Sequence, residues 1–405
     1  MRATFSISLS LLLVTLASTA SAQRENRMSL GEALRRARAA APDLAVARLR
    51  ESVAHAEVGV AGLYPNPTVL AASNTQTAKF SGTVSIPLIV LGQRGAAMDA
   101  ARADEATVAL DTQVAWIDVR QATVHAFVTL WLAEGLVGAR RESATIGAAL
   151  ESSVVQRVEV GSAPEIDALR AHAERVRLDA DVLDAGAQLD VAASQLGRWL
   201  SLPDGTGLRA SGAPSLATDS PAPLPSLLAR LDSGAPVRRE QSDVRASEAR
   251  AARERALVRP SMAIDLGVDT YDPTLNDVPN YRAQLAIDVP IFNQRGPAID
   301  REKALGDVAR ARVQVARALA SAEVTSAYHV FEAATARQKL LAGSVVPATE
   351  AAAKGVEEAY SLGRAQLIAV LDAERALVDA RVTALDAQAA AANAWADVEH
   401  ALGVP

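Results

Sequence analysis

The sequence predicts a mainly α-helical fold in which two internal repeats each carry a short pair of β-strands. Three observations predict it: landmarks of the first half recur about 202 residues later, each half holds a helical segment too long for a compact domain, and each half holds strands with alternating apolar and polar side chains. A duplication of this kind implies two structurally equivalent units in one chain.

The first 22 residues have the order of a secretory signal. A basic residue, Arg2, precedes the apolar stretch Leu9–Val14, and small residues end at Ala22. We expect cleavage after Ala22, so residues 1–22 form no part of the predicted fold. An uncleaved anchor is the alternative, but the apolar stretch is short for a bilayer span and no stop-transfer run follows it.

Composition excludes several classes of protein. The chain has no cysteine, which removes disulfides, thiolate metal ligands and a lipoprotein anchor. A net charge of -6, no basic tract and 3% aromatic residues argue against a nucleic-acid partner. No later stretch approaches 18 uninterrupted apolar residues, so the mature protein would enter a membrane as a β-barrel or attach to its surface.

The duplication is visible in matched residues. Gly161 and Gly363 lie 202 residues apart and each follows a long helical segment. The same offset separates Pro203 from Pro405. Prolines that end strands and the glycines that follow them keep nearly the same spacing: Pro87 with Pro290, and Gly95 with Gly296.

These matches divide the mature chain into repeat 1 (residues 23–203), a connector (residues 204–222) and repeat 2 (residues 223–405). The connector region is rich in glycine and proline, which cannot continue a helix. Each repeat has the order helix, strand, strand, very long helix, helix. The predicted ranges are 29–62, 67–74, 79–88, 93–158 and 164–200 in repeat 1, and 223–258, 261–270, 281–291, 297–360 and 364–402 in repeat 2.

The predicted strands of repeat 2 have one apolar and one polar face. Strands of about 10 residues with a lipid-compatible face match the staves of membrane barrels, although an ordinary half-buried sheet gives the same alternation. Four strands cannot close a barrel, because the smallest membrane barrels use about 8; three chains would supply 12. The polar side chains that would line the lumen are Asp265, Asp269, Arg282, Gln284 and Asp288.

The predicted helices are too long for a compact domain. At 1.5 Å per residue, the segment 93–158 would extend about 100 Å, so it must form a tube, a rod or a coiled coil. Small apolar residues recur at seven-residue spacing, as in Leu371, Val378 and Leu385. This spacing does not separate a channel from a periplasmic adaptor or coiled-coil scaffold. The scaffold would have one helical hairpin and compact β-domains, without two repeats that each bear a strand pair.

Catalytic and metal-binding patterns are not found in the sequence. The histidines lack the i,i+4 or short-loop spacing of metal sites, and no phosphate loop or nucleophile elbow occurs. The sequence therefore predicts no enzyme, no cofactor and no metal site. The scattered histidines are His55, His125, His172, His329 and His400.

Several motifs resemble the TolC family of outer-membrane efflux channels over essentially the whole mature chain. The run from Ala359 to Gly363, continuing to Leu371-Asp372-Ala373, is similar to the family's helix-turn-helix at the periplasmic tip. Ile86-Pro87-Leu88 and Val289-Pro290-Ile291-Phe292, each leading into Gln-Arg-Gly, resemble its strand-to-helix junctions. The junctions are most similar to those of CzcC-like channels in heavy-metal resistance-nodulation-division exporters.

The resemblance implies a homotrimer with a 12-stranded barrel in the lipid of the outer membrane and a 12-helix α-barrel across the periplasm. It implies the channel subunit of a tripartite pump, which passively conducts divalent heavy-metal cations or drugs. Its partners would be a periplasmic adaptor, or membrane fusion protein, and an inner-membrane resistance-nodulation-division pump.

The resemblance also implies a gate at the periplasmic tip. Inter-helix contacts there would hold the tube closed until partners dock, and the exposed tip turns would receive the adaptor. The pattern departs from the family, since Ala365 and Ala369 stand where basic and acidic residues are usual. The implied gate residues are Asp167, Tyr360, Arg364 and Asp372, and the implied docking residues are Gly161, Ser162 and Gly363.

Overall fold

The computed structural model describes residues 26–73, 80–202, 207–214, 222–270 and 278–404. The predicted signal at residues 1–22 and part of the connector lie outside them. The chain forms two compact units, each of which takes segments from both halves of the sequence. Unit 1 contains residues 1–35, 125–215 and 339–389, and unit 2 contains residues 36–124, 216–338 and 390–405.

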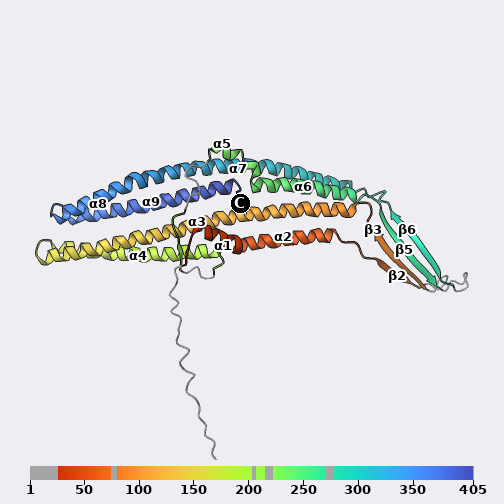
Figure 1. The fold of residues 1–405 in the computed structure, drawn as a ribbon, viewed down its shortest axis with the longest axis horizontal. Coiled ribbons are helices and arrows are strands. Elements are labelled where there is room, and N and C mark those ends of the chain that lie inside the picture. Colours follow the sequence, from red (N-terminus) through yellow and green to blue (C-terminus); the bar gives the residue numbers. More distant parts are fainter. Residues whose placement is uncertain (1–25, 74–79, 203–206, 215–221, 271–277, 405) are drawn as a thin grey trace, which may run out of the picture. The chain divides into compact units, whose positions relative to one another are not determined.

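Unit 2 contains one antiparallel sheet of four strands in the order β2-β3-β5-β6 (Figure 1). The central pair, β3 and β5, comes from the two halves and pairs over nine positions, from Phe80 with Thr270 to Leu88 with Met262. The prediction for β5 is confirmed in full. The strand predicted over 281–291 extends beyond the observed β6, which ends at Asp288. Pro290 has no N–H to donate to a neighbouring strand, so the strand cannot continue through it. The strands are β2 (Thr68–Ala72), β3 (Phe80–Leu88), β5 (Ser261–Thr270) and β6 (Asn280–Asp288).

Two predicted helices of unit 2 are broken. The helix predicted over 29–62 is interrupted at Ala41, which is extended (ψ 129°) because the ring of Pro42 disfavours a helical residue before it. The helix predicted over 223–258 is interrupted at Gly234, which is extended before Ala235-Pro236. The observed elements are α1 (Leu30–Ala40), α2 (Pro42–Ala61), α5 (Leu224–Leu228), a 3-10 turn (Leu231–Ser233) and α6 (Ala235–Ala256).

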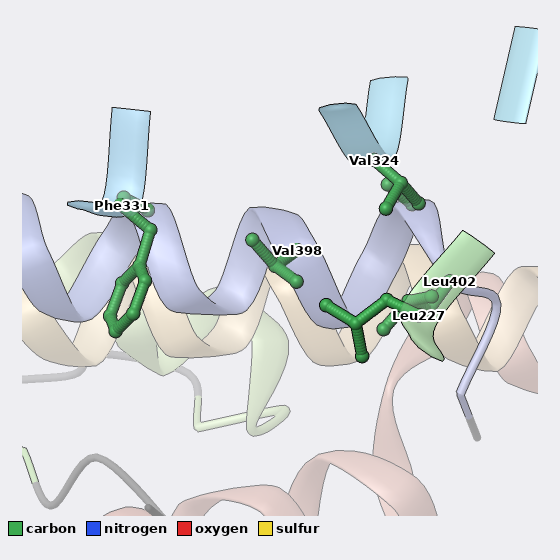
Figure 2. Packing of buried hydrophobic residues seen from close by; sticks show 7 residues of the cluster. Leu227, Val324, Phe331, Val398 and Leu402 are labelled. Carbon is green, nitrogen blue, oxygen red and sulfur yellow. The ribbon is translucent and has the colours of Figure 1, made fainter. Parts of the chain in front are cut away.

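A hydrophobic core in unit 2 holds α5 against two long helices. Leu227 of α5 packs with Val324 and Phe331 of α7 (Gly296–Leu340) and with the C-terminal part of α9 (Leu367–Ala401) (Figure 2). The rings of Phe331 and Trp395 lie 5.2 Å apart. Burial of each large side chain contributes about 1.5–3 kcal/mol, which fixes this short helix despite its few residues.

Unit 1 is built from helices and one small sheet. The predicted helix 297–360 is not uniform: a π-helical turn, Leu341–Val345, separates α7 from α8. Pro347 follows it and has no N–H to donate to the preceding turn, and a π turn accommodates such a gap. The parallel pair β1 (Asn26–Met28) with β4 (Leu208–Ala210) was not predicted, and β4 lies in the segment assigned as connector. The helices that lie wholly or mostly in unit 1 are α3 (Gln93–Glu159), α4 (Glu165–Trp199), α8 (Val346–Ser361) and α9. Residues 93–124 of α3 and 390–401 of α9 belong to unit 2.

Among the described residues, α3 alone contains an 18-residue window apolar enough to cross a membrane, with a mean hydropathy of 1.3. Of that window, 39% is buried. Core helices of soluble proteins can have the same length and apolar composition.

Candidate functional site: the strand surface and the helix turns

The β-register brings the five predicted lumen residues to one face of the sheet. Asp265 lies opposite Gln284, and Gly267 lies opposite Arg282. Because side chains alternate along a strand, Asp269 and Asp288 share this face. Arg282 Nε lies 3.0 Å from Asp269 Oδ2, so the guanidinium crosses between the two strands. The face is polar and charged over β5 and β6.

The opposite face of the sheet is apolar and exposed. Val84 pairs with Leu266, which pairs in turn with Ala283, so their side chains form one apolar row. Tyr281 is 80% exposed on this face, and Leu285 and Ile287 are also exposed. A sheet in water would cover such a face. The edge strands β2 and β6 each have one strand neighbour in the described part of the chain.

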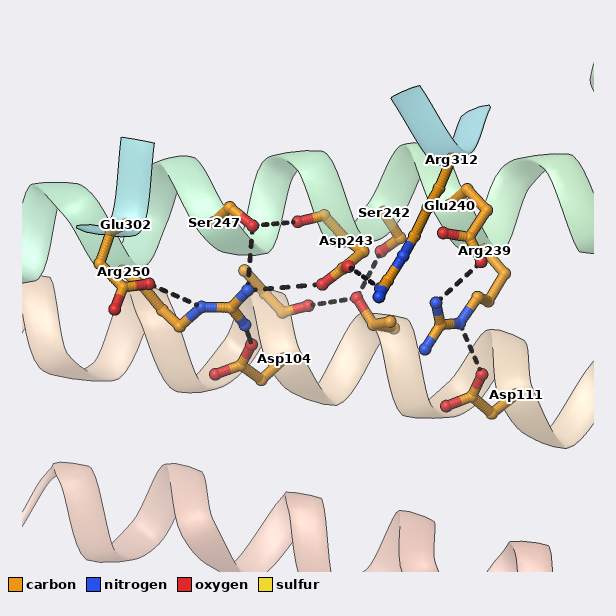
Figure 3. Close-up of polar contacts among 12 residues, drawn as sticks. Asp104, Asp111, Arg239, Glu240, Ser242, Asp243, Ser247, Arg250, Glu302 and Arg312 are labelled. Carbon is orange, nitrogen blue, oxygen red and sulfur yellow. Dashed lines mark hydrogen bonds and ion pairs between the residues drawn. The ribbon is translucent and has the colours of Figure 1, made fainter. Parts of the chain in front are cut away.

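An ion-pair cluster joins three helices of unit 2 (Figure 3). Arg250 of α6 pairs with Asp104 of α3 and lies 3.4 Å from the Glu302 carboxylate of α7. Burial raises the pKa of Asp104 despite the guanidinium beside it. Thr107 and Ser242 share a buried hydrogen bond of 3.1 Å between α3 and α6. These contacts give the helix order α3-α6-α7.

The flanking helices of unit 2 expose apolar rows at coiled-coil spacing. α2 contacts α3 through His55 and Glu105 (2.8 Å), and so takes the outer position beside α3. Val46, Leu49, Val53 and Val60 lie on its exposed side. α7, at the other end of the helix order, exposes Leu305, Val308, Val315 and Leu319. Both rows follow the three- and four-residue spacing of helices that pack against another helix.

The repeated Gln-Arg-Gly motifs anchor the junctions between strands and helices. Arg94 donates from Nε to the Gly62 carbonyl (2.6 Å) and lies over the ring of Tyr64 at 4.6 Å. Arg295 donates to Glu254, whose side chain is 3% exposed and lies in the last turn of α6. Burial opposes ionisation of Glu254, but the bonds from Arg295 and Arg253 lower its pKa. Each motif therefore fixes the helix that precedes its strand pair, a role that sequence reasoning missed.

Gly161 and Gly363 close two equivalent turns in unit 1, as their predicted role requires. Their φ angles are +74° and +72°. In both, the residue after the glycine donates its N–H to a carbonyl five residues earlier at 2.8 Å: Ser162 to Arg157, and Arg364 to Ala359. This Schellman motif satisfies the last carbonyls of α3 and α8.

A second pair of helix ends shows the same motif at the same offset. Leu202 N–H donates to the Gly197 carbonyl at the end of α4, and Val404 N–H donates to the Glu399 carbonyl at the end of α9. The residue with positive φ is Gly403 in the second half and Ser201 in the first, with φ of +64° and +51°. Ser201 carries the strain that a side chain meets in this conformation.

The structure does not bring the predicted gate residues together. Asp167 pairs with Arg170 of its own helix (3.7 Å), and Asp372 pairs with Arg375 (3.7 Å). The ring of Tyr360 lies 4.7 Å from the Arg157 guanidinium, and Arg364 is exposed. In the described ranges, no hydrogen bond or ion pair joins any two of the four.

The strongest polar link in this region is one that sequence reasoning missed. Glu174 of α4 is 8% exposed and accepts hydrogen bonds from Arg177 (2.7 Å) and from Arg375 of α9 (2.6 Å). The two guanidiniums lower the pKa of Glu174 to about 2. A cavity of about 580 Å³ lies beside it between α3, α4 and α9. The link joins helices from the two halves, and nothing local in the sequence indicates it.

A second carboxylate in this region has the opposite environment. Glu374 lines the same cavity and a neighbouring one beside α8. Burial, followed by the nearby charge of Glu357, raises its pKa. Arg381, whose charge opposes this shift, is bonded to Glu142 and Glu350, each at 2.9 Å. Within the described residues no three acidic or histidine side chains gather as metal ligands.

The fold and one segment of the chain match known proteins. Residues 235–404 match the outer membrane efflux protein family. The cobalt-zinc-cadmium resistance protein CzcC of Cupriavidus metallidurans is 22% identical over 354 residues, covering 85% of this chain and 82% of that protein. The CmeC outer membrane channel of Campylobacter jejuni has a TM-score of 0.74 at 15% identity, covering 92% of this chain and 85% of its own. VceC, an outer membrane protein of Vibrio cholerae, has a TM-score of 0.70 at 15% identity, covering 92% and 96%. The predicted TolC-like, mainly helical fold class is confirmed.

Proposed function

We infer that the chain, a member of the outer membrane efflux protein family, is the outer-membrane channel of an efflux pump. One observation carries the inference: the four-stranded sheet exposes an apolar face on one side and a charged face on the other. In a membrane barrel the apolar face would contact lipid and the charged face would contact water, so each face would have a suitable environment. The family is one of transport proteins and not of enzymes.

We propose that three copies close a 12-stranded barrel with the charged face inward. Each copy has two different edges. One edge is formed by β2 and α2, and the other is formed by β6 and α7. α2 leads into β2, and α7 follows β6, so the edges of neighbouring copies would meet antiparallel. The exposed rows on α2 and α7 would then cover each other, as the strands β2 and β6 pair. Three copies of the four-stranded sheet would supply 12 strands, a number within the range of membrane barrels. The helices would continue as the 12-helix periplasmic tube.

The two-repeat organisation is part of this proposal, with repeats at 23–203 and 223–405, a connector at 204–222 and a signal cleaved after Ala22. The Schellman motifs at the ends of α3 and α8, and of α4 and α9, support it, because each pair is separated by 202 residues. Sequencing the N-terminus of the mature protein tests the cleavage site.

Partners and substrate follow from the proposed role. A channel that spans only the outer membrane needs a periplasmic adaptor and an inner-membrane pump of the resistance-nodulation-division class. We propose divalent heavy-metal cations as substrates, because the relative CzcC is a cobalt-zinc-cadmium resistance protein. Deleting the gene should lower tolerance to zinc, cadmium or cobalt salts. Loss of tolerance to hydrophobic drugs alone would assign the channel to a drug pump.

The turns that end α3 and α8 are proposed as the adaptor docking surface, through Gly161, Ser162 and Gly363. The gate is proposed at Asp167, Tyr360, Arg364 and Asp372. Within one copy, no hydrogen bond or ion pair joins any two of these residues in the described ranges. A gate of this kind would require contacts between copies. Unchanged conductance and leakiness in Asp167→Ala and Arg364→Ala channels would remove these residues from the gate.

The channel and the scaffold alternative differ in where the protein is found and what it conducts. The channel should be recovered from outer-membrane fractions as a heat-modifiable, SDS-resistant oligomer and should open pores in planar bilayers. Full recovery in the soluble periplasm without pore activity would favour the adaptor or coiled-coil scaffold.

A further inference from the structure

Two cavities within unit 1 meet at the side chain of Glu374. One lies between α3, α4 and α9, the other lies between α3, α8 and α9, and each has a volume of about 580 Å³. Ile146, Leu150 and Glu374 belong to the walls of both. Cavities of this volume bind drug-sized molecules in other proteins. The walls and charges of the cavities therefore decide which kind of molecule they would take.

The wall that the two cavities share is apolar apart from Glu374. Ile146 and Leu150 lie one turn apart on α3. The apolar wall continues with Leu178 of α4 in the first cavity and with Val370 of α9 in the second. A molecule bound here would lose water from its surface against these side chains, so it needs an apolar body.

Each arginine that lines the cavities in the described part of the chain already has a partner in the same chain. The pairs are Arg140 with Asp181, Arg177 and Arg375 with Glu174, and Arg157 with the ring of Tyr360. An anionic ligand would have to displace one of these partners. The cavities therefore do not favour an anion.

Two carboxylates at the second cavity lack a partner of this kind. Within the described residues, neither Glu374 nor Glu357 forms a hydrogen bond or an ion pair through its side chain. Glu374 is partly buried and Glu357 is exposed. Burial and the charge of Glu357 raise the pKa of Glu374. Its negative charge is therefore poorly compensated in the fold, and a cation beside it would correct this.

We propose that the adjoining cavities bind an organic cation, an amine carried on an apolar or aromatic body. The ammonium group lies beside Glu374 and Glu357, and the body packs against Ile146 and Leu150. A metal ion fits less well, because no three acidic or histidine side chains gather among the described residues and such ions bind several ligands. The site lies within one chain and goes beyond the proposed channel function.

Isothermal titration calorimetry of the full-length oligomer in a nonionic detergent tests the proposal. The probe is 1-naphthylmethylamine, which is protonated at neutral pH, and 1-naphthylmethanol is its uncharged counterpart. The amine should bind the wild type at least about tenfold more tightly than the alcohol, and about tenfold more tightly than it binds Glu374→Gln. Asp184→Asn, an exposed position of α4 outside both cavities, is the control and should bind the amine as the wild type does.

Weaker binding to Glu374→Gln would not report unfolding, because this substitution removes a charge that is unfavourable in the fold. Equal affinity of the wild type for the amine and the alcohol would overturn the cation site. Equal affinity of the wild type and Glu374→Gln for the amine, or no binding of the amine, would also overturn it. Absence of pores in planar bilayers would remove the channel function and leave these binding results unaffected.

Discussion

Glu174→Gln should loosen the contact between α4 and α9 in unit 1. The buried carboxylate bonds both Arg177 and Arg375, and its removal breaks the ion pair that links α4 to α9. Lowering the pKa of Glu174 from 4.5 to about 2, at about 1.4 kcal/mol for each pKa unit, corresponds to about 3 kcal/mol of stabilisation at neutral pH. Because the folded-state pKa is lowered, this stabilisation is complete above pH 4.5 and is lost as the pH falls toward 2.

Amide hydrogen exchange on the full-length oligomer can measure this effect. At pH 7, peptides from α4 and α9 should exchange roughly 10²-fold faster in Glu174→Gln than in the wild type, and the difference should shrink at pH 3. Asp184→Asn, an exposed position on the same helix, is the matched control and should change little. Equal exchange in wild type and Glu174→Gln at pH 7 would refute the assigned role of this carboxylate.

Three further predictions concern backbone strain and pH. Ser201→Gly should stabilise the end of α4 by about 1 kcal/mol, because glycine adopts positive φ without strain; an unchanged or lower thermal midpoint would contradict this. Gly403→Ala should destabilise the end of α9 by about 2 kcal/mol or more, since the new Cβ would lie 2.6 Å from Pro236 Cδ and 2.9 Å from the Ala235 nitrogen. Glu374→Gln should raise stability at pH 7, because the raised pKa of Glu374 means that its charged form is unfavourable in the fold. Wild-type stability should then increase as the pH falls through that pKa, and the variant should lack this increase in thermal melts.

The two faces of the sheet could be predicted from the sequence. The alternation of apolar and polar residues that identifies a strand also determines which side chains share a face. Asp265, Gln284 and Arg282 lie on one face since strand geometry leaves no other choice once β5 and β6 pair. The turns at Gly161 and Gly363 were predictable for a similar reason, because a tight reversal requires positive φ. These features depend on residues close together in the chain.

The breaks in the helices were missed although their residues are visible in the sequence. Pro42, Gly234 and Pro347 each lie within a segment whose helical composition continues on both sides. The outcome differed at each: an extended residue before Pro42, a separate short helix before Gly234 and a π turn before Pro347. The packing of α5 on its hydrophobic core decides the second case, and periodicity cannot predict such packing.

The polar links of unit 1 could not be predicted. Glu174 and Arg375 are 201 residues apart, and each belongs to a helix with many charged residues. Their pairing depends on how α4 and α9 pack, so the family pattern directed attention to Asp167 and Arg364 instead. At the junctions, the repeated Gln-Arg-Gly was visible, but the partners of Arg94 and Arg295 were not.

The most direct test of the proposed channel is whether β2 of one copy meets β6 of the next. Ala71 and Ala283 lie on the apolar face of these edge strands, and cysteines placed at both would react with a short thiol cross-linker. In outer-membrane fractions, the double variant should give bands of two and three copies and none larger, while either single variant should stay monomeric after denaturation. Monomer alone in the double variant, or a ladder beyond three copies, would contradict a closed ring of three chains.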